Sequence, residues 1–193
     1  MTTERADAAR NRAVLIETAR EMLTDVGIER LTMDALAERS GLGKGTVFRR
    51  FGTRSGIFMA LLGDGERAFQ KRVLSGPPPL GPGAEPLDRL VAFGPARLRF
   101  LMENREIARA ALGGRTPVPF GPPAMVTQRH LRTLLQQLGI DAADLDILAM
   151  QLTAALDVPL LLYTAPEDGD HPEKTFEDRL ARGWEDLVGR LAR

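Results

Sequence analysis

The chain has 193 residues, with 26 basic and 26 acidic side chains, two histidines and no cysteine. This length allows two unequal helical domains, and the absence of cysteine excludes disulfides, thiolate metal sites and cysteine nucleophiles. His130 and His171 are too few for a multi-histidine metal site, so we expect neither a metal nor a cofactor.

The zero net charge conceals an asymmetry along the chain. Residues 1–75 carry 13 basic and 10 acidic side chains, whereas residues 76–193 carry 13 basic and 16 acidic ones. The segment from Arg39 to Arg54 holds five basic residues and no acid. Such a local field attracts phosphates, although an ordinary solvated face would have the same composition.

The N-terminal residues MTTERADAARNR are polar, and no run approaches the roughly 18 apolar residues that a membrane span needs. We therefore expect a cytoplasmic protein without a membrane segment.

Helical periodicity begins near the N-terminus. An apolar stripe that stops at Gly27 predicts a helix over about 8–26 and consists of Leu15, Ala19, Met22, Leu23 and Val26. Thr32 is a good N-cap for a short helix over 33–40, which Gly41 ends. A second short helix is expected over 44–51, and a longer one over about 54–73. Three compact helices around a glycine turn indicate a helix-turn-helix within about 33–52.

The segment SGPPPLGPGAEP (75–86) contains five prolines and three glycines, which predicts a linker between two domains, 1–74 and 87–193. Further helices are expected over about 86–111, interrupted at Gly94-Pro95, and then over 122–138, 142–163 and 173–192. No useful length alternates with period two, so the predicted fold class is all-α.

The residue pattern of the helix expected over 44–51 predicts a surface that contacts DNA. Val47 and Phe51 lie four residues apart and point inward, while the opposite side presents Gly45 and Arg49, flanked by Thr46 and Arg50. Small, polar and cationic groups suit insertion into a major groove. At the N-termini of neighbouring helices, Thr32 and Arg54 are placed to hold phosphates.

The run VLIETAREMLTDVGIERLTMDALAERSGLGKGTVFRRFGTRSGIFMALL (14–62) resembles the DNA-binding domain of the TetR family. Positions that agree with the family pattern include Gly27, Thr32, Ala37, Gly41, Lys44, Gly45, Thr46, Arg49, Phe51 and Phe58. The resemblance implies an N-terminal three-helix DNA-binding domain and a C-terminal helical domain that binds an effector and dimerises. It also implies a homodimer on a palindromic double-stranded DNA operator, released by a small and mainly apolar effector. Repression is the expected outcome.

Family roles then fall on Lys44, Gly45, Thr46, Arg49 and Arg50 in the groove, with Thr32 and Arg54 at phosphates. Three positions depart from the family pattern. Phe48 lacks the hydroxyl with which the family's aromatic residue binds phosphate, Gly43 replaces the usual Ser or Asp N-cap, and Arg50 replaces a histidine and adds a permanent charge.

In the C-terminal domain only the helical layout follows from the resemblance. The last two helices are expected to dimerise through Leu152, Leu156, Tyr163, Phe176, Leu180, Trp184 and Leu187, for which monomer core is the alternative. Candidate effector contacts are Phe93, Met102, Phe120, Met125, His130, Met150 and Asp157, for which ordinary core is again the alternative. Asp157 stands in an apolar run, so it either faces solvent, pairs with an arginine, caps a break at Pro159 or contacts a ligand.

An enzyme is disfavoured, because the sequence has no nucleophile elbow, phosphate-binding loop, dinucleotide fingerprint or zinc-protease motif. The remaining alternative, suggested by Phe48 and Gly43, is a helical protein-interaction module that keeps the TetR-like fold with weakened DNA binding.

Overall fold

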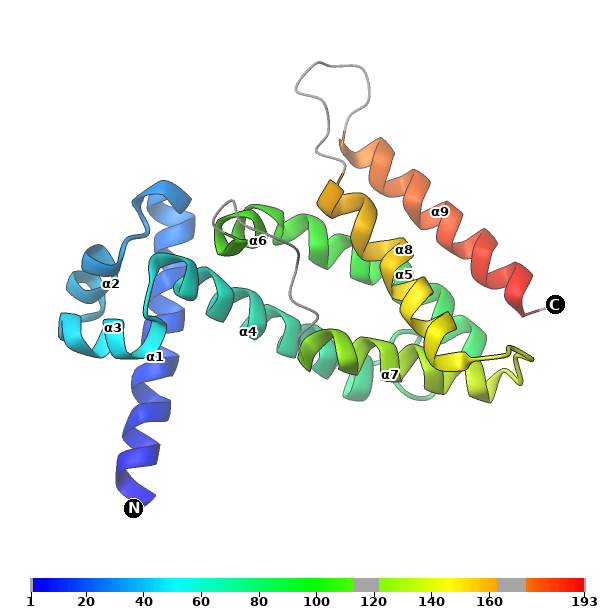
Figure 1. Cartoon of the computed structure of the whole chain (residues 1–193), viewed down its shortest axis with the longest axis horizontal. Coiled ribbons are helices and arrows are strands. Elements are labelled where there is room, and N and C mark those ends of the chain that lie inside the picture. Colours follow the sequence, from blue (N-terminus) through cyan, green and yellow to red (C-terminus); the bar gives the residue numbers. More distant parts are fainter. Residues whose placement is uncertain (1, 113–121, 163–172, 193) are drawn as a thin grey trace. The chain divides into compact units, whose positions relative to one another are not determined.

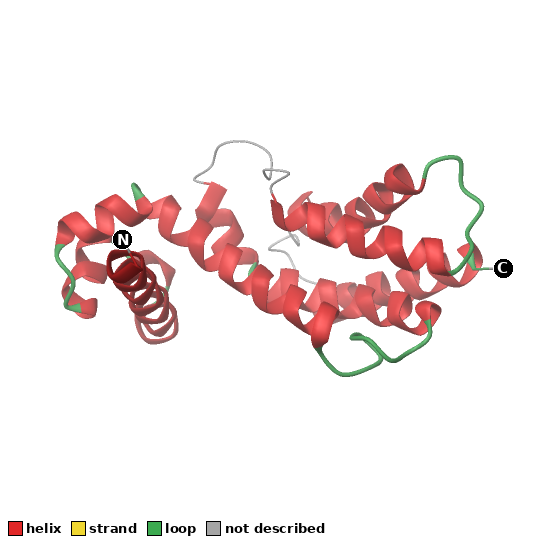
Figure 2. Cartoon of the chain, turned by 90° about the horizontal axis from the view of Figure 1, so that it is seen from below, coloured by secondary structure: helices red, strands yellow, loops and turns green. Residues whose placement is uncertain are grey.

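A computed structural model describes residues 2–112, 122–162 and 173–192, which are helices joined by short loops (Figure 1). Its elements are α1 (Thr2–Val26), the 3-10 turn η1 (Ile28–Arg30), α2 (Met33–Ser40), α3 (Lys44–Phe51), α4 (Arg54–Ser75), α5 (Pro86–Glu103), α6 (Arg105–Leu112), α7 (Pro122–Gln137), α8 (Leu145–Leu162) and α9 (Glu173–Leu191). Within these ranges there is no strand (Figure 2), which confirms the all-α prediction. No helix in the described ranges is long and apolar enough to cross a membrane.

Two compact units divide the chain. The first comprises Met1–Gly65 and Glu106–Val118, and the second comprises Glu66–Arg105 and Pro119–Arg193. This division differs from the expected boundary at 75–86, because α4 runs without a break through residues 65 and 66. The proline-rich segment lies inside the second unit, where Leu80 packs against the core.

The core of the first unit follows the periodicity of the sequence. Leu15, Ile16, Ala19 and Met22 of α1 are buried together with apolar residues of the next three helices, which include Leu36, Val47, Ile57, Phe58 and Leu61. Val47 is fully buried and Phe51 is half-buried against this core, as the helix pattern predicts. Ile107, Ala110 and Ala111 of α6 complete it from a distant part of the sequence.

In the second unit, α5 packs against α9 and α7 packs against α8. An aromatic cluster fills the centre. The Phe69 ring lies 5.7 Å from that of Phe93 and 5.4 Å from that of Phe100, and Phe93 lies 6.4 Å from Trp184. The indole of Trp184 donates a hydrogen bond from Nε1 to the carbonyl oxygen of Leu90, at 2.8 Å. This bond satisfies the polar atom of an otherwise apolar side chain.

The predicted interruption at Gly94-Pro95 is wrong, because α5 continues through Pro95 to Glu103. The chain instead breaks at Asn104, whose side-chain amide donates to the carbonyl oxygen of Phe100 at 2.8 Å. Gly94 has a packing role, since a Cβ atom there would lie 2.1 Å from Cδ1 of Trp184. Likewise α8 remains helical through Pro159, so this proline ends no helix.

Gly94→Ala is therefore expected to destabilise the protein, although alanine is the better helix former. Overpacking against the buried indole should lower the free energy of unfolding by about 1–3 kcal/mol. Denaturant unfolding and the emission spectrum of Trp184 measure the effect. Gly189→Ala is the control, since its new Cβ atom meets nothing within 4 Å. Equal stability of the two variants would contradict the packing role of Gly94.

Candidate nucleic-acid interface

The first unit presents a helix-turn-helix made of α2, a three-residue turn and α3. Thr32 caps α2, because its Oγ1 accepts a hydrogen bond from the backbone N–H of Ala35 at 3.1 Å. Gly41 ends α2 in the left-handed region, with φ at 67°, which glycine adopts without strain. Gly43 caps α3 with backbone alone, its carbonyl oxygen accepting from the N–H of Thr46 at 2.8 Å.

The outer face of α3 is exposed and cationic. Lys44, Gly45, Phe48, Arg49 and Arg50 are exposed, and Thr46 is half-buried. Along the described ranges, the side chains of Arg49 and Arg50 have neither a hydrogen bond nor an ion pair to the protein. Lys44 pairs with Asp34 at 2.7 Å, but both side chains are 69% exposed, so water screens this pair strongly. The face can therefore offer its positive charges to an anionic partner.

Gly45 has no role in the packing of its own chain. A Cβ atom added there would meet nothing within 4 Å, and its backbone is not in the left-handed region. Glycine within a helix nevertheless costs about 1 kcal/mol relative to alanine. The space above Gly45 is therefore free for a group from outside the chain.

Phe48 is 51% exposed, an unusual position for a phenyl ring beside two free arginines. It offers apolar area and no hydrogen bond to a partner. The structure thus places Phe48 on the same face as the predicted groove residues.

Arg54, predicted to bind phosphate, is already engaged within the first unit. Its guanidinium donates to the carbonyl oxygens of Leu31 at 2.8 Å and Ile28 at 2.6 Å, and lies 5.2 Å from the centre of the Phe58 ring. Because the carbonyl oxygens of Ile28 and Leu31 accept from this guanidinium, Arg54 has a packing role within the first unit, and its contact with phosphate stays a prediction. The side chain holds the segment before α2 against α4.

Arg54→Met is expected to lower the free energy of unfolding by about 1–3 kcal/mol, through lost charge-assisted hydrogen bonds. The salt dependence of duplex DNA binding should stay unchanged. Arg50→Met is the matched control, because it removes an exposed arginine without a partner. That variant should keep its stability and lose about one unit of salt slope per protomer. The reverse pattern would assign Arg54 to the phosphate contacts.

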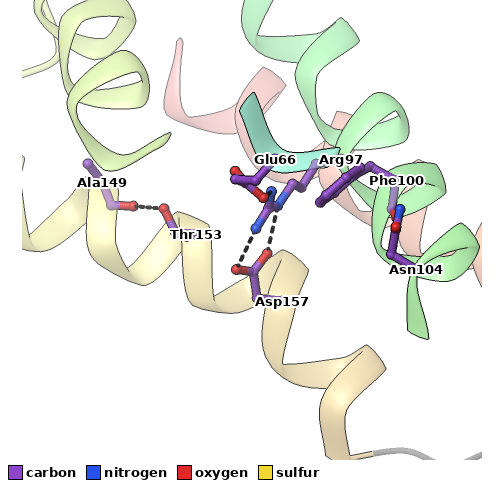
Figure 3. A network of polar contacts seen from close by, with 7 residues as sticks. All are labelled: Glu66, Arg97, Phe100, Asn104, Ala149, Thr153 and Asp157. Atoms are coloured by element: carbon purple, nitrogen blue, oxygen red, sulfur yellow. Dashed lines mark hydrogen bonds and ion pairs between the residues drawn. The ribbon is translucent and has the colours of Figure 1, made fainter. Parts of the chain in front are cut away.

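Asp157, the polar exception of α8, pairs with an arginine (Figure 3). Arg97 of α5 donates from Nε to Oδ1 of Asp157 at 3.0 Å and from Nη2 to Oδ2 at 3.1 Å. Its third contact, from Nη1, reaches Oε2 of Glu66 at 2.6 Å. Of the alternatives for Asp157, the structure thus shows an ion pair with an arginine.

Burial would lower the pKa of Arg97, but the charges and hydrogen bonds of Asp157 and Glu66 offset it and raise that pKa above its ordinary value. Sequence reasoning did not identify Glu66 or Arg97. They lie 31 residues apart, and Arg97 lies 60 residues from Asp157. No local spacing signals such a cluster.

The other effector candidates lie in different surroundings. Phe93 is buried in the core, 1% exposed, and its ring lies 5.8 Å from that of His130. Met102 is half-buried, and Met150 is 38% exposed at the surface of α8, which corrects its assignment to an internal pocket. The predicted contacts Phe120 and Met125 fall outside the residues whose side chains the structure describes.

Several predicted dimer residues belong to the core of a single chain. Leu152, Leu156 and Trp184 are 3%, 2% and 3% exposed, so they have no surface to offer a partner, and their assignment is corrected. These three residues instead pack in the core of one chain, which was the alternative that the sequence left open. Phe176 and Leu180 are half-buried, Leu187 is 39% exposed, and Tyr163 falls outside the described residues.

The second unit also contains a small cavity of about 10 Å³ among α4, α5 and α7. Its lining includes the buried side chains of Thr127 and His130, and among the described residues neither Thr127 Oγ1 nor His130 Nε2 has a hydrogen-bond partner. Burial and the nearby charge of Arg89 lower the pKa of His130 from 6.5 to about 4, so its ring is neutral at pH 7.

An exposed helix-turn-helix joined to a second helical unit is an arrangement found in bacterial transcription regulators. The family model described as "Bacterial regulatory proteins, tetR family" matches residues 15–61, which include α2, α3, the C-terminal part of α1 and the first part of α4. The N-terminal part of the chain thus matches the DNA-binding domain of the TetR family, as the sequence resemblance predicts.

Solved structures share its fold over nearly the whole chain. A TetR-family transcriptional regulator from Pectobacterium atrosepticum is 22% identical, with a TM-score of 0.75 over 97% of this chain and 96% of that one. A TetR/AcrR-family regulator from Thermobifida fusca is 16% identical, with a TM-score of 0.65 over 91% and 96%. No curated protein matches the sequence. At these identities the likeness shows the fold alone.

Proposed function

We propose that the chain is a repressor that binds a palindromic operator as a homodimer through the exposed face of α3, and that a small effector releases it. Gly45 carries the proposal. It stands in a helix beside free arginines, with nothing of its own chain within 4 Å of its missing side chain. A DNA backbone or base edge in the major groove is the partner that such a small, cationic face fits.

Within this proposal, Arg49 and Thr46 contact base edges, since arginine forks onto guanine and a threonine methyl or hydroxyl meets a neighbouring base. Lys44 and Arg50 bind phosphates. Thr32 joins them at the N-terminus of α2, because its hydroxyl can still donate while its oxygen accepts from Ala35.

For the homodimer, we propose the outward faces of α8 and α9 as the contact. Ile147 and Met150 of α8 are 45% and 38% exposed, and Leu187 of α9 is 39% exposed. These exposed apolar side chains lie on the predicted dimerising helices. A two-fold axis would bring each face against its own copy.

Selection from a random pool of DNA duplexes tests DNA binding with the full-length protein. We expect an inverted repeat, with half-sites about one helical turn apart, and an affinity that falls with salt concentration. The proposal would be rejected if the protein bound no duplex saturably and if its affinity for DNA did not fall as the salt concentration rises. It would leave the protein-interaction alternative, for which the exposed Phe48 is the specific observation.

Gly45→Ala is expected to change the stability of the protein and its affinity for DNA in opposite directions. The variant should be more stable by about 0.5–1 kcal/mol, because alanine favours the helix, and should bind the selected duplex at least about tenfold more weakly, a loss of about 1.4 kcal/mol. Gly183→Ala is the control, because that glycine of α9 also has no atom within 4 Å of an added Cβ. Unchanged duplex affinity of Gly45→Ala would remove the observation on which the proposal rests.

A further inference from the structure

We propose that Thr127 and His130, together with Arg89, form the head-group site for an amphipathic monocarboxylate, whose apolar tail lies against Phe69, Val73 and Val126. This inference rests on the proposed effector-binding role of the second unit and names the chemistry of that effector.

The first observation is a pair of buried polar atoms without partners at one cavity. Thr127 is 3% exposed and His130 is 8% exposed, and both line the cavity of about 10 Å³. In native proteins, buried polar atoms are almost always hydrogen-bonded, because leaving them unsatisfied is costly. Two unsatisfied atoms lining one cavity therefore point to a group that completes their hydrogen bonds.

The second observation is the positive charge beside these atoms. Arg89 of α5 donates from Nη2 to the carbonyl oxygen of Val73 at 3.3 Å, and Val73 lines the cavity. The Nε atom of Arg89 is buried and has no hydrogen-bond partner within the part of the chain that the structure describes. Burial, together with the charge of Arg89, lowers the pKa of His130 and holds its ring neutral.

Together these groups favour an acceptor that carries negative charge. The Thr127 hydroxyl donates, His130 donates in its Nε2–H tautomer, and the nearby charge of Arg89, which does not itself line the cavity, attracts an anion. A carboxylate accepts from both donors and is attracted by the charge of Arg89, whereas an ammonium group would meet donors and a like charge.

The size and lining of the cavity define how the ligand sits. A volume of about 10 Å³ holds a group of about the size of one water molecule, hence a carboxylate oxygen rather than a whole effector. The rest of the lining is mainly apolar, and Leu74, at 54% exposed, lies at its solvent side. The tail therefore enters by displacing apolar side chains of α4 and α7.

Trp184 is the reporter for this site. It is the single tryptophan of the chain, it is 3% exposed, and its ring lies 6.4 Å from Phe93, which lines the cavity. Titration of the full-length protein with octanoate should change its emission saturably, with one site per chain. Octylamine, which has the same chain length and the opposite charge, should not bind at the same concentrations.

Thr127→Val and His130→Phe should each weaken octanoate binding at least about tenfold, as expected for one lost hydrogen bond to a charged group. Thr133→Val is the matched control on α7, because that exposed hydroxyl bonds to the carbonyl oxygen of Arg129 and does not line the cavity. Thr127→Val should also raise the melting temperature of the ligand-free protein, since it removes an unsatisfied polar atom.

Equal binding of octanoate by wild type and both variants, or equal binding of octylamine, would overturn the proposal. So would a lower melting temperature of Thr127→Val without octanoate binding, which would assign the cavity to a structural water. The fluorescence titration contains no DNA, so its failure is distinct from a failure of operator binding. A protein that binds the operator and ignores octanoate contradicts this inference alone.

Discussion

The double variant Thr46→Ala/Arg49→Ala is expected to abolish sequence-specific DNA binding while the protein stays folded. Each base contact contributes about 1–3 kcal/mol of discrimination, so losing two per protomer should weaken binding to the selected operator by about a hundredfold or more. The side chain of Arg49 is exposed and has no hydrogen bond or ion pair within the described chain. Its removal should therefore change the free energy of unfolding by about 0.5 kcal/mol or less. Operator affinity by gel shift and thermal unfolding by circular dichroism measure the two effects.

Two further variants sharpen this experiment. Arg99→Ala removes another exposed arginine, from α5, and should keep the operator affinity. Lys44→Ala should weaken binding to all duplexes alike and reduce the salt slope by about one per protomer, because it removes a phosphate contact. Wild-type affinity of the double variant would show that this face of α3 does not read the operator.

Arg97→Met is expected to destabilise the protein by about 3–5 kcal/mol, the usual cost of removing one partner from a buried ion cluster. Arg97 is 6% exposed and Glu66 is 5% exposed. Without the guanidinium, the carboxylate of Glu66 is buried without a counter-charge, and Asp157 loses both of its hydrogen bonds. Urea unfolding at pH 7 measures the loss.

Replacing the whole cluster is the control for this prediction. The triple variant Glu66→Leu/Arg97→Met/Asp157→Leu should recover most of the stability, because no charge is then left unpaired in the core. Glu66→Gln should cost less than Arg97→Met, since it leaves the Arg97 pair with Asp157 intact. If Arg97→Met were as stable as wild type, the cluster would not be a stabilising unit of the core.

The first unit could be predicted in detail because its signals are local. Thr32 and Gly41 mark the ends of α2 by capping and backbone conformation. Leu15, Ala19 and Met22 of α1 repeat at helical spacing and are buried. The bounds of α2 and α3 agree with the sequence prediction residue by residue.

The second unit could be predicted only as a set of helices. The role of Gly94 depends on Trp184, which lies 90 residues later, so a local reading interprets Gly94 as a helix breaker. A stripe such as Leu152 and Leu156 of α8 indicates that one face of the helix is covered, but periodicity cannot say whether its own chain or a second copy covers it. The packing role of Arg54 could not be predicted for a similar reason, because its carbonyl partners precede it by more than twenty residues.

Helix α4 has a consequence for how the protein can be divided. Residues 54–65 belong to one unit and residues 66–75 to the other, while Ala111 of α6 returns to the core of the first. A fragment cut at the proline-rich segment would carry Phe69 and Val73 as an uncovered apolar strip and would lack the α6 residues that close its own core. Such a fragment is expected to self-associate, so the DNA-binding part is not an autonomous module that can be grafted onto another sensor at residue 75.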